Sequence, residues 1–551
     1  MTEDQRNSLC QGMTYRGFDK IEISDTEVRC HCTIETYEIS LICRLSDCFP
    51  FELPTVFISE ESYNCIAPLP HVSSDLSICT FDRTICIPNF LFPVQIILDS
   101  FCQARTTIYR GITKENSQDF FSEIEAYWNI ECDYLAESIV SPTGTIKSIQ
   151  LYCGKNILYL ADSKKELELF LSNIGIKKRF QKYYYDCLYL PLSIKIYPPF
   201  PKSNIELFKL LCSDSTTSEV YRKYAQKHIS NGFFVLTSTP NAEARCFQLW
   251  HHSSVTTNIP GFRKGHIPVQ MAYLLDNHPK SIMKFSVINM AHDRLFFRGG
   301  DGLHTNVSKC AIIGCGSVGS YFIEALAEYG VSHFVLNDND KLTADNIARH
   351  FCGYDSIGKS KISAISDQLT KHNPNISTTL FNENGILFVD SHEKILNDCD
   401  FIIVATAYTP LEYKIIEKVN SSNITKPVIV VWVEPHLAAG HAIILQKPQD
   451  VFSEYFDANF SFKDRVLKNS SDFSKKESGC QSTFTPYSAF HLKRFIYSFL
   501  EFLMNLFAQR KQGNFIFTWC GNLSTIRTLG GILEAKWADA DNFSEHITRI
   551  D

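Results

Sequence analysis

The segment KCAIIGCGSVGSYFIEALAEYG, residues 309–330, constrains the fold of this chain more than any other stretch of the sequence. Its pattern is that of a buried strand, a turn with Gly314, Gly316 and Gly319, and a helix that ends at Gly330. Glycines in such a turn let the backbone approach a phosphate, and the helix N-terminus supplies oriented N–H groups. The segment therefore predicts a nucleotide-binding turn.

Strands and helices continue to alternate after this turn. The predicted strands are SHFVLND, DFIIVATA and KPVIVVWVE, and the predicted helices are KISAISDQLTKHNPN and LEYKIIEKVNSSN. Alternation of this kind predicts an α/β fold with a doubly wound, Rossmann-like parallel sheet. The apolar stretch 427–445 contains Glu434 and His441, so it predicts two buried strands around a turn and not a membrane span.

Charged residues after the turn indicate which nucleotide the site would take. Asp338 lies 24 residues beyond Gly314, where a carboxylate would accept ribose hydroxyls. An NAD-dependent dehydrogenase would have the same features up to this point. Asn346 and Arg349, three residues apart, and Lys361 downstream are anion-binding groups beyond the ribose. They suit a triphosphate whose α-phosphate is attacked.

The order G-x-G-x-x-G, D-x-D, N-x-x-R and Lys resembles that of the ThiF-type adenylyltransferases and ubiquitin-activating enzymes, over about residues 298–445. The resemblance implies that the three glycines cradle the phosphates of ATP and that Asp338 holds the ribose. It also implies that Asn346, Arg349 and Lys361 contact the phosphates, and that Mg²⁺ is bound together with ATP. Such nucleotide domains usually pair, so a homodimer is expected.

Two features of this resemblance leave residues to be assigned. Arg298 is a candidate for the arginine that such enzymes offer to the γ-phosphate, and Arg294 is its rival. The family usually has T-D-N after a later strand, and its aspartate helps to hold magnesium. This chain has VATAYTP, with Ala407 in the aspartate position, so the magnesium ligands are unknown.

Cys480 is the first candidate nucleophile. It lies in the polar, lysine-containing stretch KNSSDFSKKESGCQSTFTPYS, before a long amphipathic helix for which Thr485 is the predicted N-cap, with Pro486 at the first helical position. A thiol near lysines and a helix N-terminus has a lowered pKa and is more reactive. In activating enzymes, a cysteine after the nucleotide domain takes the acyl group from the adenylate. The alternative is a free, partly exposed thiol.

Cys79 is the second candidate. The stretch FPFELPTVFI, then His71, then SIC ending at Cys79 resembles the order of motifs in ubiquitin-conjugating enzymes, over about residues 20–135. The resemblance implies an exposed thiol that accepts an acyl group from another thioester. Val72 and Ser73 replace the usual Pro-Asn, so the oxyanion donor is missing, and His71, Ser73 or a backbone N–H would substitute. The alternative is a buried strand thiol.

Composition excludes several classes of protein. The net charge of −7 and the lack of basic blocks argue against nucleic-acid binding. None of the twenty cysteines forms a C-x-x-C pair, so no structural zinc is expected. The polar, acidic N-terminus is not a secretory signal, and we expect a cytoplasmic protein without a membrane segment.

The chain is long enough for several domains. We predict an α+β ubiquitin-conjugating-like domain at residues 1–140, an α+β linker or middle domain at 141–285, and a ThiF-type adenylation domain with the Cys480 loop at 286–551. Within the first domain, residues 28–36 and 37–45 are expected as strands, and residues 49–58 as an edge or exit strand. Residues 92–108 and 117–138 have helical spacing.

Together the two resemblances point to the bacterial fusions of conjugating and activating enzymes found in anti-phage CBASS operons. They imply ATP-dependent activation of a partner protein's C-terminus, transfer through Cys480 and Cys79, and conjugation to a target amine. The acyl donor would be a ubiquitin-like protein or a cGAS-like nucleotidyltransferase. A sulfur-carrier-type adenylyltransferase and a catalytically impaired binding scaffold remain as alternatives.

Overall fold

The computed structural model describes residues 1–177, 179–241, 244–259, 261–263, 266–276, 281–300, 307–476 and 483–550. The chain divides into two compact units. The first comprises Met1–Leu167 and Phe180–Met290, and the second comprises Glu168–Arg179 and Ala291–Asp551. In the described ranges, every helix is too short or too polar to cross a membrane.

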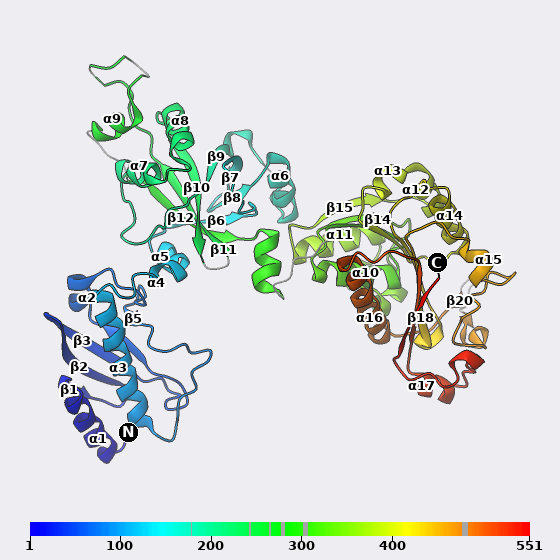
Figure 1. The fold of residues 1–551 in the computed structure, drawn as a ribbon, viewed down its shortest axis with the longest axis horizontal. Helices are drawn as coiled ribbons and strands as arrows, with labels where there is room; N and C mark the ends of the chain where they lie inside the picture. The colour runs from blue at the N-terminus through cyan, green and yellow to red at the C-terminus, as the bar shows by residue number, and fades with distance from the viewer. Residues whose placement is uncertain are drawn as a thin grey trace. The chain divides into compact units, whose positions relative to one another are not determined.

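The first unit begins with a five-stranded antiparallel sheet, shown in blue in Figure 1, whose strands follow their order in the chain. The strands are β1 (Asp19–Ile23), β2 (Glu27–Ile34), β3 (Tyr37–Arg44), β4 (Thr55–Ile58) and β5 (Ser77–Ile78), and the helices are α1 (Glu3–Tyr15), α2 (Glu60–Ile66) and α3 (Pro93–Ile112). The strands predicted at 28–36 and 37–45 and the helix at 92–108 are confirmed. The strand predicted at 49–58 is shorter, since β4 begins only after Pro54.

The helix predicted over residues 117–138 is wrong at its C-terminal end. The chain forms two short helices, α4 (Asp119–Ser122) and α5 (Ile124–Ile130), and then the strand β6 (Tyr134–Ser138). The strand forms because β6 pairs in parallel with two later strands, β8 (Ile157–Ala161) and β12 (Met283–Asn289), and this pairing overrides the local spacing. Trp128 of α5 is buried against Trp250, with ring centroids 4.3 Å apart.

The remainder of the first unit is a closed barrel with the strand order β10-β11-β12-β6-β8-β7-β9. Its further strands are β7 (Lys147–Cys153), β8 (Ile157–Ala161), β9 (Tyr184–Pro191), β10 (Phe233–Asn241), β11 (Ala244–His252) and β12 (Met283–Asn289). The helices of this region are η1 (Gln181–Tyr183), α7 (Asn204–Ser213), α8 (Ser218–His228) and α9 (Val269–Leu274), and α6 (Lys164–Asn173) begins in the first unit and ends in the second. The mixed helix and strand content expected of the middle region is therefore present, as a barrel.

The second unit contains an eight-stranded sheet with the order β15-β14-β13-β16-β17-β18-β21-β22. The strands are β13 (Lys309–Ile313), β14 (His333–Asn337), β15 (Ser377–Phe381), β16 (Phe401–Val404), β17 (Val428–Val433), β18 (Ala439–Leu445), β21 (Phe515–Cys520) and β22 (Glu545–Arg549). The first five strands of this order are parallel, which confirms the doubly wound sheet. β17 and β18 are the two buried strands predicted at 427–445. The central β13 lies at the topological switch point, where such sheets bind ligands.

Helices cover both faces of this sheet (Figure 1). They are α10 (Ser317–Tyr329), α11 (Lys361–His372), α12 (Gly385–Ser391), α13 (Glu393–Leu396), α14 (Thr409–Asn420), α15 (Val451–Tyr455), α16 (Ala489–Ala508) and α17 (Leu523–Thr528). Short elements complete the unit: η2 (Arg294–Arg298), η3 (Ala344–Arg349), η4 (Tyr354–Ser356), η5 (Pro435–Leu437), η6 (Ser470–Phe473), η7 (Ala535–Trp537), β19 (Lys475–Lys476) and β20 (Thr483–Phe484).

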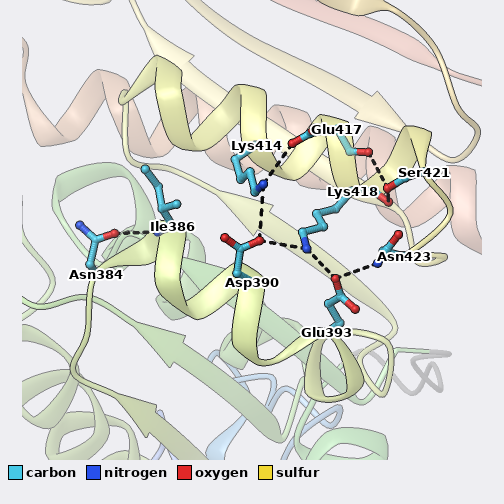
Figure 2. Close-up of polar contacts among 9 residues, drawn as sticks. All are labelled: Asn384, Ile386, Asp390, Glu393, Lys414, Glu417, Lys418, Ser421 and Asn423. Atoms are coloured by element: carbon cyan, nitrogen blue, oxygen red, sulfur yellow. Dashed lines mark hydrogen bonds and ion pairs between the residues drawn. The ribbon is translucent and has the colours of Figure 1, made fainter.

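An ion-pair cluster joins the crossover helices on one face of the sheet. Figure 2 shows Lys418 of α14 reaching Asp390 of α12 at 2.9 Å and Glu393 of α13 at 2.7 Å. Lys414, one turn earlier, lies 3.6 Å from Asp390, and the Asn423 amide donates to Glu393. These contacts hold α12, α13 and α14 together beside the sheet.

The predicted start of the long C-terminal helix is wrong by three residues. α16 begins at Ala489, and its N-cap is Ser488, whose hydroxyl accepts from the His491 amide. Thr485 and Pro486 therefore precede the helix. The Thr485 carbonyl and the Pro486 carbonyl accept hydrogen bonds from other parts of the unit, which explains why the helix does not start there.

Candidate active site

The glycine-rich turn lies between β13 and α10, at the switch point of the sheet. Gly314 has φ +89°, a conformation that favours glycine. A Cβ at residue 319 would lie 1.9 Å from the Gly314 carbonyl oxygen, so Gly319 lets α10 approach the end of β13. A Cβ at residue 316 would meet no described atom within 4 Å, which leaves space in front of the helix N-terminus. This geometry suits an approaching phosphate.

Asp338 stands beside this turn, directly after β14. Its Oδ2 accepts from the Cys315 amide at 2.7 Å, and its Oδ1 accepts from the Asp340 amide at 2.8 Å. The carboxylate is therefore fixed at the mouth of the turn, in the position expected for a ribose contact.

Two buried hydroxyls near the turn lack a hydrogen-bond partner among the described residues: Ser317 Oγ at the start of α10 and Thr406 Oγ1 after β16. Thr406 lies against the turn, since a Cβ at residue 314 would be 2.6 Å from its methyl group. Unpaired buried polar atoms are costly, so a ligand that pairs them fits this site. Sequence reasoning missed both residues, although Ser317 lies within the glycine-rich motif and Thr406 lies within the VATAYTP segment.

Two of the predicted phosphate ligands make contacts within the chain. Asn346 Oδ1 accepts from the Thr343 amide at 3.0 Å, which caps η3. Lys361 Nζ is 2.8 Å from Asp340 Oδ2 and is largely buried. Lys361 thus lies next to Asp340 of the D-x-D motif, whose amide donates to Asp338.

Arg349 contacts the stretch before α16. Its Nη1 donates to the Thr485 carbonyl at 2.8 Å, and its guanidinium lies over the Tyr487 ring, 4.7 Å from the centroid. The next residue, His350, is buried, and its Nε2 donates to the Cys315 carbonyl at 3.0 Å. Arg349 is therefore one residue away from a direct contact with the glycine-rich turn.

Ala407 stands at the position where the family resemblance implies an aspartate that helps to hold magnesium. It offers no carboxylate, and its φ is +48°. Glu412, in the first turn of α14, is a buried carboxyl that sequence reasoning missed. Burial raises the pKa of Glu412 to about 7, and its Oε1 has no partner among the described residues. The side chain of Arg298 and the whole of Cys480 lie outside the described residues, and the backbone of Arg294 and Arg298 forms η2.

Cys79 follows β5 in a tight hairpin. Val72 pairs with Ile78, and the Cys79 amide donates to the His71 carbonyl at 2.8 Å. The Cys79 side chain is exposed, so the alternative of a buried strand thiol is wrong. Partial burial, together with the nearby Glu123 carboxylate, raises the pKa of the Cys79 thiol above its ordinary value.

His71 holds an acidic cluster beside Cys79 that the sequence did not reveal. Its Nε2 is 2.9 Å from Asp119 Oδ2, and its Nδ1 is 2.8 Å from Glu123 Oε1. The Tyr127 hydroxyl accepts from the His71 amide and donates to Glu123 Oε2. Hydrogen bonding to Glu123, supported by Asp119, raises the pKa of His71 to about 9. The ring is therefore an imidazolium at neutral pH.

Comparison with known proteins finds a family match for the region of the glycine-rich turn and another for the region of Cys79. The ThiF family matches residues 296–448, and the Prokaryotic E2 family B matches residues 8–136. The chain joins a prokaryotic E2-type domain to a ThiF domain. These two domain types are those of a ubiquitin-activating and ubiquitin-conjugating-like enzyme.

Two curated proteins illustrate the similarity. The chain is 20% identical over 464 residues to the ATP-dependent ubiquitin transferase-like protein Cap2 of Pseudomonas aeruginosa (strain BWHPSA011 / Pa011), covering 80% of each protein. It is 36% identical over 127 residues to ubiquitin-like modifier-activating enzyme 5 of Drosophila erecta, covering 23% of this chain but only 29% of that relative.

Among solved structures, the crystal structure of selenomethionine PaaA matches with a TM-score of 0.29 and 20% identity. That of E. coli MccB with succinimide matches with a TM-score of 0.26 and 18% identity. Each match covers 44% of this chain and 64% of the solved chain.

Alanine substitutions at two glycines separate the fold from nucleotide binding. Gly319→Ala places a methyl group against the Gly314 carbonyl, so the second unit should lose about 1–3 kcal/mol of stability in thermal unfolding. Gly316→Ala meets no described atom and should unfold like the wild type, but its methyl group occupies the phosphate approach. ATP affinity measured by calorimetry should fall about tenfold. Wild-type ATP affinity in Gly316→Ala would contradict this placement of the phosphates.

The imidazolium of His71 can be tested by its titration. The folded pKa of about 9 lies above the ordinary 6.5, so its stabilising contribution is complete below pH 6.5 and is lost as the pH rises through about 9. NMR of histidine-labelled protein should show one imidazole with a pKa near 9 that falls markedly in Glu123→Gln. Asp82→Asn is the control, since Asp82 bonds to Thr84 and makes no contact with His71 in the described structure. A wild-type His71 pKa near 6.5 would contradict the cluster.

Proposed function

We propose that this protein activates the C-terminal carboxylate of a partner protein with ATP, captures it on Cys480, passes it to Cys79 and conjugates it to a target amine. One observation carries the proposal: an exposed thiol in an E2-type domain belongs to the same chain as a ThiF domain. An enzyme that only adenylates its substrate would not need the Cys79 thiol.

Adenylation uses the switch-point site of the second unit. A carboxylate oxygen of the donor attacks the α-phosphate of ATP, and pyrophosphate leaves. The glycine-rich turn and the α10 N-terminus bind phosphate oxygens, and Asp338 binds the ribose. Asn346, Arg349 and Lys361 supply the remaining phosphate contacts, for which Arg349 and Lys361 must exchange their present partners. By the family resemblance, Arg298 or its rival Arg294 would contact the γ-phosphate, and Mg²⁺ would be bound together with ATP.

Two acyl transfers follow, the first to Cys480 and the second to Cys79. The Cys480 sulfur attacks the acyl adenylate and releases AMP, which leaves a thioester. The Cys79 sulfur then attacks that thioester, and the Cys480 thiol is restored. The target amine finally attacks the Cys79 thioester, forms an amide and restores the Cys79 thiol.

The acidic cluster beside Cys79 defines how the last step proceeds. Both ring nitrogens of His71 face carboxylates, so His71 holds Asp119 and Glu123 in place and leaves the oxyanion to backbone N–H groups or Ser73. The hydrogen bond from His71 keeps the pKa of Glu123 low despite its burial, so this carboxylate is ionised. Its negative charge attracts the target ammonium toward Cys79, and the amine loses its proton to solvent before it attacks.

The partners are inferred from the resemblance to the bacterial CBASS fusions and not from a residue of this chain. The acyl donor is a protein with a reactive C-terminus, either ubiquitin-like or a cGAS-like nucleotidyltransferase in antiviral defence. The acceptor is a protein amine, the enzyme acts in the cytoplasm, and its ThiF domains pair as a homodimer. Sulfur-carrier activation would leave Cys79 without a role. Ala407 favours a second candidate, a binding scaffold with an impaired nucleotide site.

Isotopic exchange between ATP and pyrophosphate separates the enzyme from the scaffold. With a cGAS-like nucleotidyltransferase or a ubiquitin-like protein as donor, exchange should require the donor's intact C-terminus. Lys361→Ala should reduce it about a hundredfold, because a fixed positive charge is lost where phosphate charge develops. Cys79→Ala and Cys480→Ala are matched controls that keep exchange, since adenylation precedes both thiols. Absence of exchange with both donors would favour the scaffold.

A further inference from the structure

The chain leading into and out of the Cys480 stretch is held in the second unit at two places. The first is Glu434, directly after β17. Its Oε1 accepts from the Val466 amide and its Oε2 from the Leu467 amide, both at 2.7 Å. The buried His441 donates to the same carboxylate at 2.8 Å. Three hydrogen bonds to this buried carboxyl group anchor the segment before Cys480.

The second anchor is weaker and lies on the other side of Cys480. Arg349 donates to the Thr485 carbonyl and lies over the Tyr487 ring, and the His436 amide donates to the Pro486 carbonyl at 2.5 Å. Arg349, Thr485 and Tyr487 are only partly buried. Thr485 is five residues after Cys480 in the sequence.

The position of Arg349 connects this second anchor to the nucleotide turn. The neighbouring His350 donates to the Cys315 carbonyl inside the glycine-rich turn, and the Phe351 amide donates to Ser320 Oγ on α10. A guanidinium that turns toward phosphates at this turn must give up the Thr485 carbonyl and the Tyr487 ring, since both contacts fix its present direction.

We propose that Arg349 exchanges between two mutually exclusive partners, the phosphates of ATP and the Thr485–Tyr487 segment, so that nucleotide binding releases the chain that follows Cys480. The anchor at Glu434 stays closed throughout. This inference rests on the proposed function for the site of ATP binding. It adds a positioning role for Arg349. Through this role, nucleotide binding changes how firmly the chain after Cys480 is held.

Because the two contacts of Arg349 compete, the direction of the change in ATP affinity tests the proposal. If Arg349 must leave Tyr487 to bind ATP, a variant that weakens the Tyr487 contact must bind ATP more tightly. Tyr487→Ala in the full chain should lower the Kd for a non-hydrolysable ATP analogue about two- to fivefold, the worth of an exposed cation–π contact. Tyr487→Phe keeps the ring face and should bind like the wild type.

Hydrogen exchange supplies a readout that does not depend on catalysis. The analogue should speed amide exchange at His436 and in the peptide covering residues 485–490, and should leave Val466 and Leu467 protected. Arg349→Met should show the faster exchange without nucleotide, and the analogue should add nothing more.

Three outcomes decide the matter. Tighter binding by Tyr487→Ala together with faster exchange supports the proposal. Unchanged exchange, or weaker binding by Tyr487→Ala, overturns the coupling alone, because Arg349 then binds phosphate without leaving the segment. Failure of the wild-type protein to bind the analogue overturns the nucleotide site of the proposed function, and the coupling with it.

Discussion

The nucleotide half of this protein depends on how closely α10 approaches the end of β13. That approach requires Gly319, because any Cβ there would enter the Gly314 carbonyl oxygen. It brings the helix N-terminus to the switch point of the sheet, where Asp338 fixes the turn through the Cys315 amide. The same turn receives the His350 ring, which ties the N-x-x-R segment to it. The geometry of the phosphate-binding turn and the position of the N-x-x-R segment beside it both depend on this one contact.

Local patterns predicted most of the second unit. Strand and helix alternation gave β13, β14, β16 and β17 with their helices, because a buried parallel sheet leaves continuous apolar runs. Two of the failures share one cause. β6 was read as helix, and the start of α16 was placed at Thr485, because partners distant in the sequence decide both conformations. Spacing within one segment carries no information on such partners.

The candidate sites show the same division. The glycines and Asp338 could be found from motif order, since their roles depend on neighbours in the motif. The acidic cluster could not, because Asp119 is 48 residues from His71 and belongs to a segment with no motif of its own. Ser317, Thr406 and Glu412 stand out only through burial without partners. The sequence suggested His71 as a substitute oxyanion donor. In the structure, both ring nitrogens of His71 contact carboxylates instead.

The central claim is that one acyl group moves between two thiols of this chain. Non-reducing gels of the full protein with ATP and an acyl donor test it most directly. The wild type should form a DTT-sensitive adduct with the donor, Cys480→Ala should form none, and Cys79→Ala should retain the adduct on Cys480 but lose transfer to amines. If Cys79→Ala leaves transfer to target amines intact, the account of Cys79 as the second carrier is wrong.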